Sequence, residues 1–385
     1  MHILFVSSAL HKEYGGPPVA VVEVAISLSK LGNKIDLYIF GQSQDSVLAN
    51  VEFYTRVKAQ GIQIRTAKSI KTRVHGGIGN FSDLFNLYKC ISRSDAISLH
   101  GVYNFQNLIS AIFALISKTP YALMPHGTLT KYQRSKHFKR KILVDPIFFG
   151  FLLRYAERIL VASEIEKNEI RSSLKSKTCI VGLGIDIPDQ SSFKIEEMLG
   201  KKTFIFLFMG RIAPKKRLDL ALEAFSNLPH EIQEESKFVI CGSGEENYVS
   251  SIKTKVEELF IADRVEFKGW VIAHEKSEIL QNSDCFLLTS EDENFAIAAG
   301  EALAYGIPCI LSTKVALSNV VKKYGAGKVF SRLEPPEISE AMSEIFRSDL
   351  VDLKLKARNA GKEISWDFVS KNWDLEFKRI VGEEN

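Results

Sequence analysis

Residues 204–225 read FIFLFMGRIAPKKRLDLALEAF: an apolar run, a short loop, and then apolar residues every three or four positions. The run has the length of a buried strand, and the spacing after it is typical of an amphipathic helix. A strand followed by a loop and a helix is the repeating element of sheets whose strands run parallel. The stretch therefore predicts a parallel sheet covered by helices.

The same alternation extends in both directions along the chain. Strands are predicted before this stretch at HILFVSS (2–8), KIDLYIF (34–40), AISLHG (96–101), YALMPHG (121–127) and RILVAS (158–163), and after it at KFVICGSG (237–244), RVEFKG (264–269), CFLLTS (285–290) and IPCILS (307–312). Helices are expected between them. One spans 15–32, with Pro18 near its first turn and Gly32 at its end, and another follows an S-x-x-E capping box at 163–166. Two consecutive doubly wound sheets of the Rossmann type are the predicted fold class.

A Gly- and Pro-rich segment, KTCIVGLGIDIPDQSS (177–192), separates the two halves and is predicted to be a linker. We expect an N-terminal Rossmann-like domain at 1–182 and a second Rossmann-like domain at 183–363. A closing helix at 364–385 is expected to return to the first domain. In that helix Trp366, Val369, Trp373, Phe377 and Ile380 recur every three or four positions and form one apolar face.

Composition excludes several classes of protein. Of the 385 residues 45% are hydrophobic, enough for a full core. The five cysteines show no C-x-x-C spacing, which favours reduced, buried thiols. No apolar run reaches the length of a membrane span, and the first residues lack the basic segment of a signal peptide. We expect a cytoplasmic protein, peripheral at the inner face of the membrane if its basic half contacts lipid.

The charge is unevenly distributed. Residues 1–185 contain 24 Lys and Arg against 12 Asp and Glu, whereas the remaining residues contain 26 against 34. An excess of one sign over a whole domain favours partners of the opposite sign. The first half is therefore expected to bind something anionic.

Two groups of residues in the second half could hold a nucleotide. Arg211 and Lys216 fall on the loop and first turn after the 204–209 strand, where cations beside a helix N-terminus suit a diphosphate. Lys215 and Arg217 could equally be solvated surface residues. In SEDENFAIAAGEALAYGIPCI (290–310), two glutamates flank a run of small residues.

This second group has its own chemistry. First-turn N–H groups after Asn294, Phe295, Ala296 and Ile297 would attract phosphate oxygens. Glu301 could accept hydrogen bonds from ribose hydroxyls and Glu293 from those of a sugar, with small residues letting the nucleotide approach the backbone. The alternative is a capping carboxylate at Glu293 and a half-exposed helical one at Glu301.

The ordered set of motifs resembles glycosyltransferase family 4, whose members are retaining enzymes with the GT-B fold. The matching positions are Gly15 and Gly16 in the first loop, His126 in PHG, Gly184-Ile185-Asp186 in the linker, Gly210, Arg211 and Lys216 in G-R-x-x-x-x-K, Gly242 and Gly244 in GSG, and Glu293 with Glu301. The resemblance covers nearly the whole chain. It implies two Rossmann-like domains that face a cleft, an acceptor-binding domain at 1–182 and a nucleotide-sugar-binding domain at 183–363.

The resemblance also implies roles for these residues. His126, Arg211, Lys216 and Glu293 would be catalytic, with the two cations neutralising the departing diphosphate and His126 contacting the donor sugar. His100, which also ends a strand before a glycine, is its nearest competitor. The remaining landmarks would bind donor: Gly15, Gly16, Gly210, Gly242, Gly244, Asn294, Phe295, Ala296, Ile297 and Glu301. No side-chain nucleophile is required, because the leaving phosphate can take the acceptor proton.

The chain departs from the family pattern at Glu293-Asn294-Phe295-Ala296, where Glu-Gly-Phe-Gly is usual, and at Leu183, where Asn is usual. Asn tolerates left-handed backbone better than most residues, so Asn294 is a mild change. Ala296 is expected to narrow the space around the donor sugar. The choice of donor is therefore open.

Directly after PHG comes a basic stretch, KYQRSKHFKRKIL (131–143), followed by apolar PIFFGFLL (146–153). Its cations are Lys131, Arg134, Lys136, Lys139, Arg140 and Lys141. A basic face beside an apolar helix indicates an anionic membrane surface or an anionic, lipid-linked acceptor. The alternative is a solvated helix face beside a core helix.

The predicted function is transfer of a sugar from a nucleotide-diphosphate sugar to a glycan or lipid-linked glycan, as in cell-surface polysaccharide biosynthesis. No metal and no cofactor are expected, because the sequence has no HExxH, no paired Cys/His spacing and no D-x-D at a strand end. Nucleic acid is not expected, because aromatic stacking partners are scarce beside the basic stretch. The alternatives are a nucleotide-sugar epimerase of the same fold and a non-catalytic two-lobed binding protein.

Overall fold

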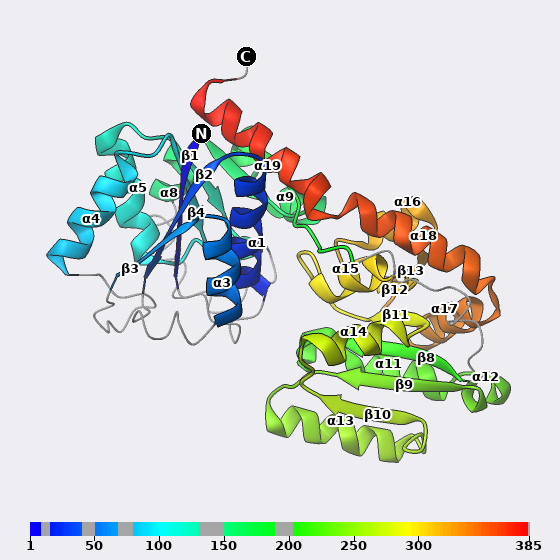
Figure 1. Ribbon diagram of the computed structural model, residues 1–385. Helices are drawn as coiled ribbons and strands as arrows, with labels where there is room; N and C mark the ends of the chain where they lie inside the picture. Colours follow the sequence, from blue (N-terminus) through cyan, green and yellow to red (C-terminus); the bar gives the residue numbers. More distant parts are fainter. Residues whose placement is uncertain (9–15, 41–50, 68–79, 131–149, 189–202, 384–385) are drawn as a thin grey trace. The chain divides into compact units, whose positions relative to one another are not determined.

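The computed structural model describes residues 1–8, 16–40, 51–67, 80–130, 150–188 and 203–383. These residues form two compact units (Figure 1). Unit 1 comprises Met1–Gly184 and Trp366–Asn385, and unit 2 comprises Ile185–Ser365. Unit 2 is therefore one continuous segment inserted before the last helix of unit 1.

Unit 1 contains a seven-stranded sheet in the order β3-β2-β1-β4-β5-β6-β7. Its strands are β1 (His2–Ser8), β2 (Lys34–Phe40), β3 (Gln63–Ala67), β4 (Ala96–His100), β5 (Tyr121–Met124), β6 (Arg158–Val161) and β7 (Thr178–Ile180). All neighbours pair in parallel. The strand order reverses between β1 and β4, and ligands of such sheets bind at the carboxyl ends on either side of the reversal.

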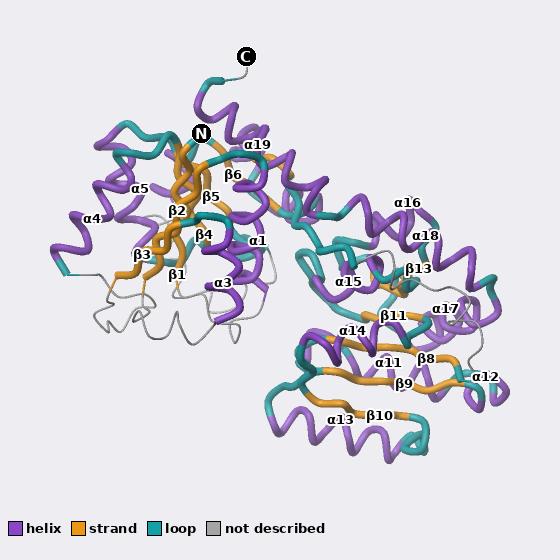
Figure 2. Tube along the Cα trace, viewed as in Figure 1, coloured by secondary structure: helices purple, strands orange, loops and turns teal. Residues whose placement is uncertain are grey.

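The helices of unit 1 form two layers around the sheet. They are α1 (Gly16–Lys30), α3 (Val51–Ala59), α4 (Phe81–Ile91), α5 (Phe105–Ser117), α8 (Gly150–Tyr155), α9 (Glu164–Glu169), η3 (Ser172–Lys177) and α19 (Trp366–Val381). α1 packs against α3 and α19, whereas α5 packs between α4 and α8 (Figures 1 and 2). Each face of the sheet is thus covered, as parallel sheets require.

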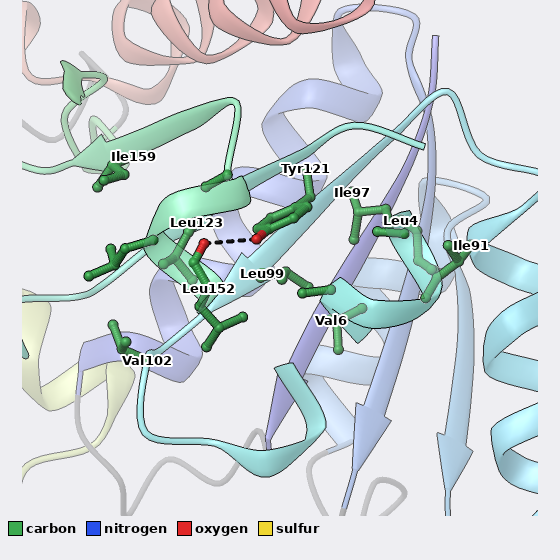
Figure 3. Close-up of a cluster of buried hydrophobic side chains, with 14 of the residues drawn as sticks. Leu4, Val6, Ile91, Ile97, Leu99, Val102, Tyr121, Leu123, Leu152 and Ile159 are labelled. Atoms are coloured by element: carbon green, nitrogen blue, oxygen red, sulfur yellow. Dashed lines mark hydrogen bonds between the residues drawn. The ribbon is translucent and has the colours of Figure 1, made fainter. Parts of the chain in front are cut away.

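The core of unit 1 lies between the central strands and the α5–α8 layer (Figure 3). Leu99 and Leu123 are completely buried there. Tyr121 keeps its hydroxyl group satisfied by donating a 2.8 Å hydrogen bond to the carbonyl of Leu152. This bond joins the end of the sheet to α8, and burial raises the pKa of Tyr121 far above its usual value.

The last helix of the chain completes unit 1. α19 buries Trp366, Val369, Trp373 and Phe377, so the predicted apolar face is confirmed. The indole Nε1 of Trp373 donates a 3.1 Å hydrogen bond to the carbonyl of Gly182. A Cβ atom at Gly184 would lie 2.3 Å from Trp366, so glycine is required there for α19 to dock.

Unit 2 contains a six-stranded parallel sheet in the order β10-β9-β8-β11-β12-β13. Its strands are β8 (Phe204–Met209), β9 (Ser236–Cys241), β10 (Val265–Gly269), β11 (Cys285–Leu288), β12 (Cys309–Ser312) and β13 (Gly327–Phe330). Its helices are η5 (Pro214–Lys216), α11 (Leu218–Ser226), α12 (His230–Glu234), α13 (Glu246–Glu258), α14 (Ala273–Gln281), α15 (Ile297–Ala304), α16 (Ser318–Tyr324), α17 (Pro335–Arg347) and α18 (Leu350–Glu363). The order reverses between β8 and β11, and the predicted pair of doubly wound parallel sheets is confirmed.

Three strands escaped the sequence analysis. Residues 178–180, assigned to the linker, form β7 and pair with β6. β3 (QIRTA) was not predicted because it is short and only two of its residues are apolar. β13 (GKVF) was not predicted because it is short and begins with a glycine and a lysine. All three lie at the edges of the sheets, where half-exposed strands lack a continuous apolar run.

Candidate functional site

The candidate site of unit 2 is built from two loops that follow neighbouring strands, β8 and β11. Thr289, just after β11, donates its hydroxyl to the carbonyls of Lys216 (2.9 Å) and Arg217 (2.7 Å). The backbone N–H of Glu291 donates to the carbonyl of Lys215 at 2.9 Å. These three hydrogen bonds hold the two loops together at the point where the strand order reverses.

Two lysines converge on one carboxylate in this place. Lys216 Nζ lies 2.6 Å and Lys215 Nζ 3.3 Å from Glu293 Oε1. The side chains of Lys216 and Glu293 are only 13% and 12% exposed. We call Lys215, Lys216 and Glu293 the two-lysine cluster. Lys215, for which the sequence left a solvated position equally open, is 21% exposed and lies beside Glu293.

Burial and charge act in opposite directions on this cluster. Burial lowers the pKa of Lys216, the charge and hydrogen bond of Glu293 raise it, and the charges of Lys215 and Arg211 lower it further. Burial alone would raise the pKa of Glu293, but the two lysines outweigh it and the net pKa is lowered. Arg211 itself is exposed, next to Gly210. The two-lysine cluster and Arg211 therefore bring three cations and one carboxylate to the loops after β8 and β11.

Arg217 has a different task from its neighbours. It lies in the left-handed region (φ 49°), where a side chain costs about 1 to 2 kcal/mol, and serves as the N-cap of α11. Its guanidinium lies 2.9 Å from Asp219 and 3.1 Å from Glu291. These ion pairs tie the β8 loop to the β11 loop a second time and keep Arg217 away from the two-lysine cluster.

The glycines of this region permit close approach of backbone to backbone. A Cβ atom at Gly242 would lie 1.8 Å from the carbonyl oxygen of Gly210, and one at Gly244 would lie 2.0 Å from that of Ile212. The loops after β8 and β9 are joined by hydrogen bonds from Gly210 N to Cys241 O and from Ile212 N to Ser243 O. Gly210, Gly242 and Gly244 therefore shape the loop that carries Arg211.

Glu301 lies in α15 and has a cationic partner. Its Oε1 accepts a 2.6 Å hydrogen bond from Lys276 in the first turn of α14. Because α14 and α15 both begin at the carboxyl ends of strands, this pair lies at the same edge of the sheet as the two-lysine cluster. Sequence analysis did not find Lys276, because one lysine in a polar helix resembles any solvated lysine.

The start of α15 deviates from the expected geometry. The left-handed residue is Ala296 (φ 70°, ψ 69°), whereas Asn294 has no left-handed backbone. The tolerance of Asn for left-handed backbone is therefore not used at Asn294, and the residue that needs this tolerance is Ala296. Ala296 forms the N-cap of α15 without a side-chain cap bond, Phe295 is buried, and Ile297 opens the helix. Asn294 Oδ1 is buried without a hydrogen-bond partner among the described residues.

The small residues of α15 allow other parts of unit 2 to pack closely against this helix. A Cβ atom at Gly361 of α18 would lie 2.7 Å from the Cα atom of Ala304, and one at Gly300 would meet Ile185 at 2.7 Å. Ala299, Ala302 and Ala304 are buried. The expectation that this run lets a nucleotide approach the backbone therefore has a competing explanation, since α18 packs closely against the same helix.

Unit 1 contains a second group of polar residues, at the ends of β4 and β5. His126 Nε2 and His100 Nδ1 are 3.0 Å apart, and His100 Nε2 is 2.9 Å from Ser98 Oγ. The two histidines that the sequence presented as competitors thus form one hydrogen-bonded chain. Burial lowers the pKa of His126 to about 4, and burial and His126 hold the pKa of His100 well below its usual value. The lowered pKa values favour the neutral form of both rings.

Glu166 positions His126 and was missed by the sequence analysis. Its Oε1 accepts from Gly127 N at 2.7 Å and its Oε2 from Ala162 N at 3.0 Å. Ser163 does accept the N–H of Glu166 as predicted, but the carboxylate binds the turn after β5. His126 lies in the left-handed region (φ 54°), and this bond holds the turn in that form.

Some predicted residues lie outside the described part of the chain. These are Gly15 and the basic stretch with Lys131, Arg134, Lys136, Lys139, Arg140 and Lys141. Gly16 is the first residue of α1, which follows β1. Across the described ranges, no helix is both long and apolar enough to cross a bilayer. Within the same ranges, no set of three or more His, Cys, Asp or Glu is arranged to hold a metal ion.

Comparison with known proteins relates this geometry to sugar transfer. Residues 189–364, slightly less than half of the chain, match the family model described as glycosyl transferases group 1. Mannosylfructose-phosphate synthase of Agrobacterium fabrum is 23% identical, with 90% of this chain and 82% of that protein aligned. UDP-Gal:alpha-D-GlcNAc-diphosphoundecaprenol alpha-1,3-galactosyltransferase of Escherichia coli is 25% identical over 61% of this chain and 62% of that protein.

Solved structures show the same fold. HepE of Anabaena in complex with UDP superimposes with a TM-score of 0.76 at 16% identity, covering 98% of this chain and all of that one. Sucrose-phosphate synthase from Thermosynechococcus elongatus superimposes with a TM-score of 0.72 at 16% identity over both whole chains. The fold is GT-B, and by its relatives and its matching family model the chain is a glycosyltransferase.

Proposed function

We propose that this glycosyltransferase uses a nucleotide-diphosphate sugar, works with retention and without a metal ion, and belongs to family 4. The observation that carries the proposal is the two-lysine cluster, in which Lys215 and Lys216 converge on Glu293 at the β8–β11 reversal. The related galactosyltransferase uses UDP-Gal, and the structurally similar HepE was solved in complex with UDP, which supports a nucleoside diphosphate as the leaving group.

Departure of a nucleoside diphosphate concentrates negative charge on its outer phosphate. One ammonium group about 4 Å from that charge contributes roughly 4 kcal/mol at an effective dielectric constant near 20. Lys216 and Arg211 are the cations proposed to stabilise it, and Lys215 adds a third. Glu293 opposes the effect of burial on the pKa of Lys216 and so favours the ammonium form.

The remaining residues are proposed to orient the donor. Glu293 and Glu301 would accept hydrogen bonds from sugar and ribose hydroxyls, and the first-turn N–H groups of α15, after Asn294 and Ala296, would bind phosphate oxygens. Gly16 and the GSG loop would line the donor site. His126 would contact the donor sugar as a neutral imidazole, because its lowered pKa excludes a cationic form at pH 7.

The acceptor is proposed to be a glycan or lipid-linked glycan bound by unit 1, at the inner face of the membrane. Two relatives that are named for lipid-containing molecules support this proposal. One is the galactosyltransferase described above, and the other is alpha-monoglucosyldiacylglycerol synthase of Streptococcus pneumoniae, which is 25% identical over 52% of this chain and 49% of that protein. The excess of cations in residues 1–185 supports an anionic acceptor or surface.

A thermal-shift screen of nucleotide-sugars tests the donor. A ligand at 100 times its dissociation constant adds about 2.7 kcal/mol of stability, which is readily measured. Lys216→Met should lose the shift, whereas the exposed Lys322→Met in α16 should keep it. With the donor found, NMR of the product reports the anomeric configuration. An inverted product, or transfer that requires a divalent cation, would contradict the proposal.

A further inference from the structure

Helix α5 carries apolar side chains on its exposed side as well as toward the core. It buries Gln106, Asn107 and Ser110 together with two alanines, while Ile112, Leu115 and Ile116 are 39%, 41% and 62% exposed. No residue of the helix, FQNLISAIFALIS, carries a charge. A helix on the surface of a water-soluble domain normally does the opposite.

Hydrogen bonds keep the helix in this orientation. Asn107 Nδ2 donates to the carbonyls of His100 (2.9 Å) and Gly101 (2.6 Å), which lie outside the helix. Rotating α5 to bury its isoleucines would break the Asn107 bonds and leave buried carbonyl groups unsatisfied. The apolar side is therefore held outward by the structure.

The neighbouring helix extends the apolar surface. α4 lies beside α5 (Figure 1) and exposes Phe81 (86%) and Phe85 (52%). The two helices touch through an edge-to-face contact of Tyr88 and Phe113, with ring centroids 5.6 Å apart. We call the exposed side chains of Phe81, Phe85, Ile112, Leu115 and Ile116 the α4–α5 face. Large exposed apolar patches on soluble domains mark sites of association.

The charges around this face suit an anionic partner. Lys89 lies over the ring of Phe85 at 4.4 Å, and the exposed Lys118 caps α5. The two acids on the same segments are engaged by backbone N–H groups, Asp83 with that of Asn80 and Asp95 with that of His2. Arg93 adds a further exposed cation. A second copy of the chain would bring the same cations against these, so self-association is electrostatically disfavoured.

We propose that the α4–α5 face docks on the surface of an anionic phospholipid bilayer. Large apolar side chains enter the region between headgroups and acyl chains, while Lys89, Arg93 and Lys118 meet lipid phosphates. The same helix contacts the strand end that carries His100, through Asn107. Docking therefore holds the histidine chain close to the lipid surface on which an acceptor would be carried. The inference rests on the proposed lipid-linked acceptor.

Flotation of the full chain with vesicles tests this inference. We expect binding to phosphatidylcholine vesicles that contain phosphatidylglycerol, and at least tenfold weaker binding to pure phosphatidylcholine. Leu115→Glu and Ile116→Glu should each weaken binding at least tenfold. Leu355→Glu in α18 is the matched control, because Leu355 is 46% exposed in unit 2, and it should bind as the unchanged chain does.

Several outcomes would overturn the inference. The unchanged chain not floating, equal binding to both vesicle types, or Ile116→Glu floating normally would each do so. A dimer in sedimentation velocity that Ile116→Glu dissociates would identify the face as an interface between copies. Each variant must keep its thermal shift with the nucleotide-sugar donor, so a defect in folding or in the donor site is recognised separately.

Discussion

The ammonium nitrogen of Lys216 lies 2.6 Å from Glu293 Oε1, and the two residues belong to loops after different strands, β8 and β11. Their contact depends on backbone bonds that hold those loops together, above all the two from Thr289. The charge that would meet a leaving diphosphate is thus positioned by the sheet itself. Substitutions at this pair should affect transfer without unfolding unit 2.

Lys216→Met should lower kcat/KM about 100- to 1,000-fold, as loss of one group that stabilises transition-state charge generally does. Lys215→Met should cost less, about tenfold, because Lys215 is the more distant from Glu293 and also donates to the carbonyl of Asp292. Steady-state transfer kinetics measure both. Equal losses in the two variants would contradict the ranking, and Lys322→Met provides the unaffected control.

The pH dependence of UDP binding should report the protonation of Lys216. Burial lowers the pKa of this lysine and Glu293 raises it, so Glu293→Gln should lower it further. Affinity depends on the charged ammonium, so the loss of UDP binding at alkaline pH should begin at a lower pH in the variant. Calorimetric titration across pH measures the shift. Glu291→Gln is the control, because Glu291 pairs with Arg217; an equal shift there would refute the assignment.

Glu301→Gln should reduce discrimination between ribose and deoxyribose. If the carboxylate accepts from the ribose hydroxyls, the unchanged protein should prefer UDP over 2′-deoxy-UDP about tenfold or more, and the variant should bind both similarly. Lys276→Met keeps the carboxylate while removing its partner, and should retain a preference for ribose. Identical preferences in Glu301→Gln and the unchanged protein would exclude Glu301 from the ribose site.

Ala296→Gly should stabilise the protein, although glycine weakens the interior of a helix. Relief of a left-handed alanine is worth about 1 to 2 kcal/mol, of which the greater freedom of the unfolded chain removes about 0.4 to 1. Urea unfolding should show a net gain near 0.5 to 1 kcal/mol. Ala298→Gly, at the second residue of α15, should instead lower the free energy of unfolding by about 1 kcal/mol. A loss at both positions would show that Ala296 is not strained.

Gly361→Ala should destabilise unit 2 by about 1 to 3 kcal/mol, because the new methyl group would meet the backbone of Ala304 and force α15 and α18 apart. Thermal unfolding measures the loss. Gly150→Ala at the start of α8 is the control, since nothing lies within 4 Å of its Cβ position. A drop in donor affinity along with stability is expected, because α15 carries Glu301.

The order of elements was largely predictable from the sequence, for a physical reason. Strands such as β1, β8 and β11 are buried on both faces, so they appear as continuous apolar runs. β7 was assigned to a linker because it precedes a Gly- and Pro-rich segment and only one of its three residues is buried. The edges of both sheets were thus the hardest parts to predict.

The residue types of the candidate site could be predicted from the sequence, but the residues that they contact could not. Lys216 and Glu293 follow strand ends, a position visible in the sequence. Lys276 and Glu166 act through contacts between residues distant in sequence, and the pattern around Glu166 pointed to a local cap instead. The left-handed backbone at Ala296 was unpredictable for a similar reason, since alanine gives no indication of positive φ.

The position of α19 also determines the order in which the two units can complete their folding during translation. Unit 2 is continuous, so it can fold as soon as residue 365 is available. Unit 1 lacks α19, and with it the fully buried Trp373, until all of unit 2 has been synthesised. At typical elongation rates this delay lasts on the order of ten seconds or more. The nascent N-terminal half, in which apolar residues such as Phe5 are not yet covered by Phe377 of α19, is therefore expected to be a chaperone client during translation.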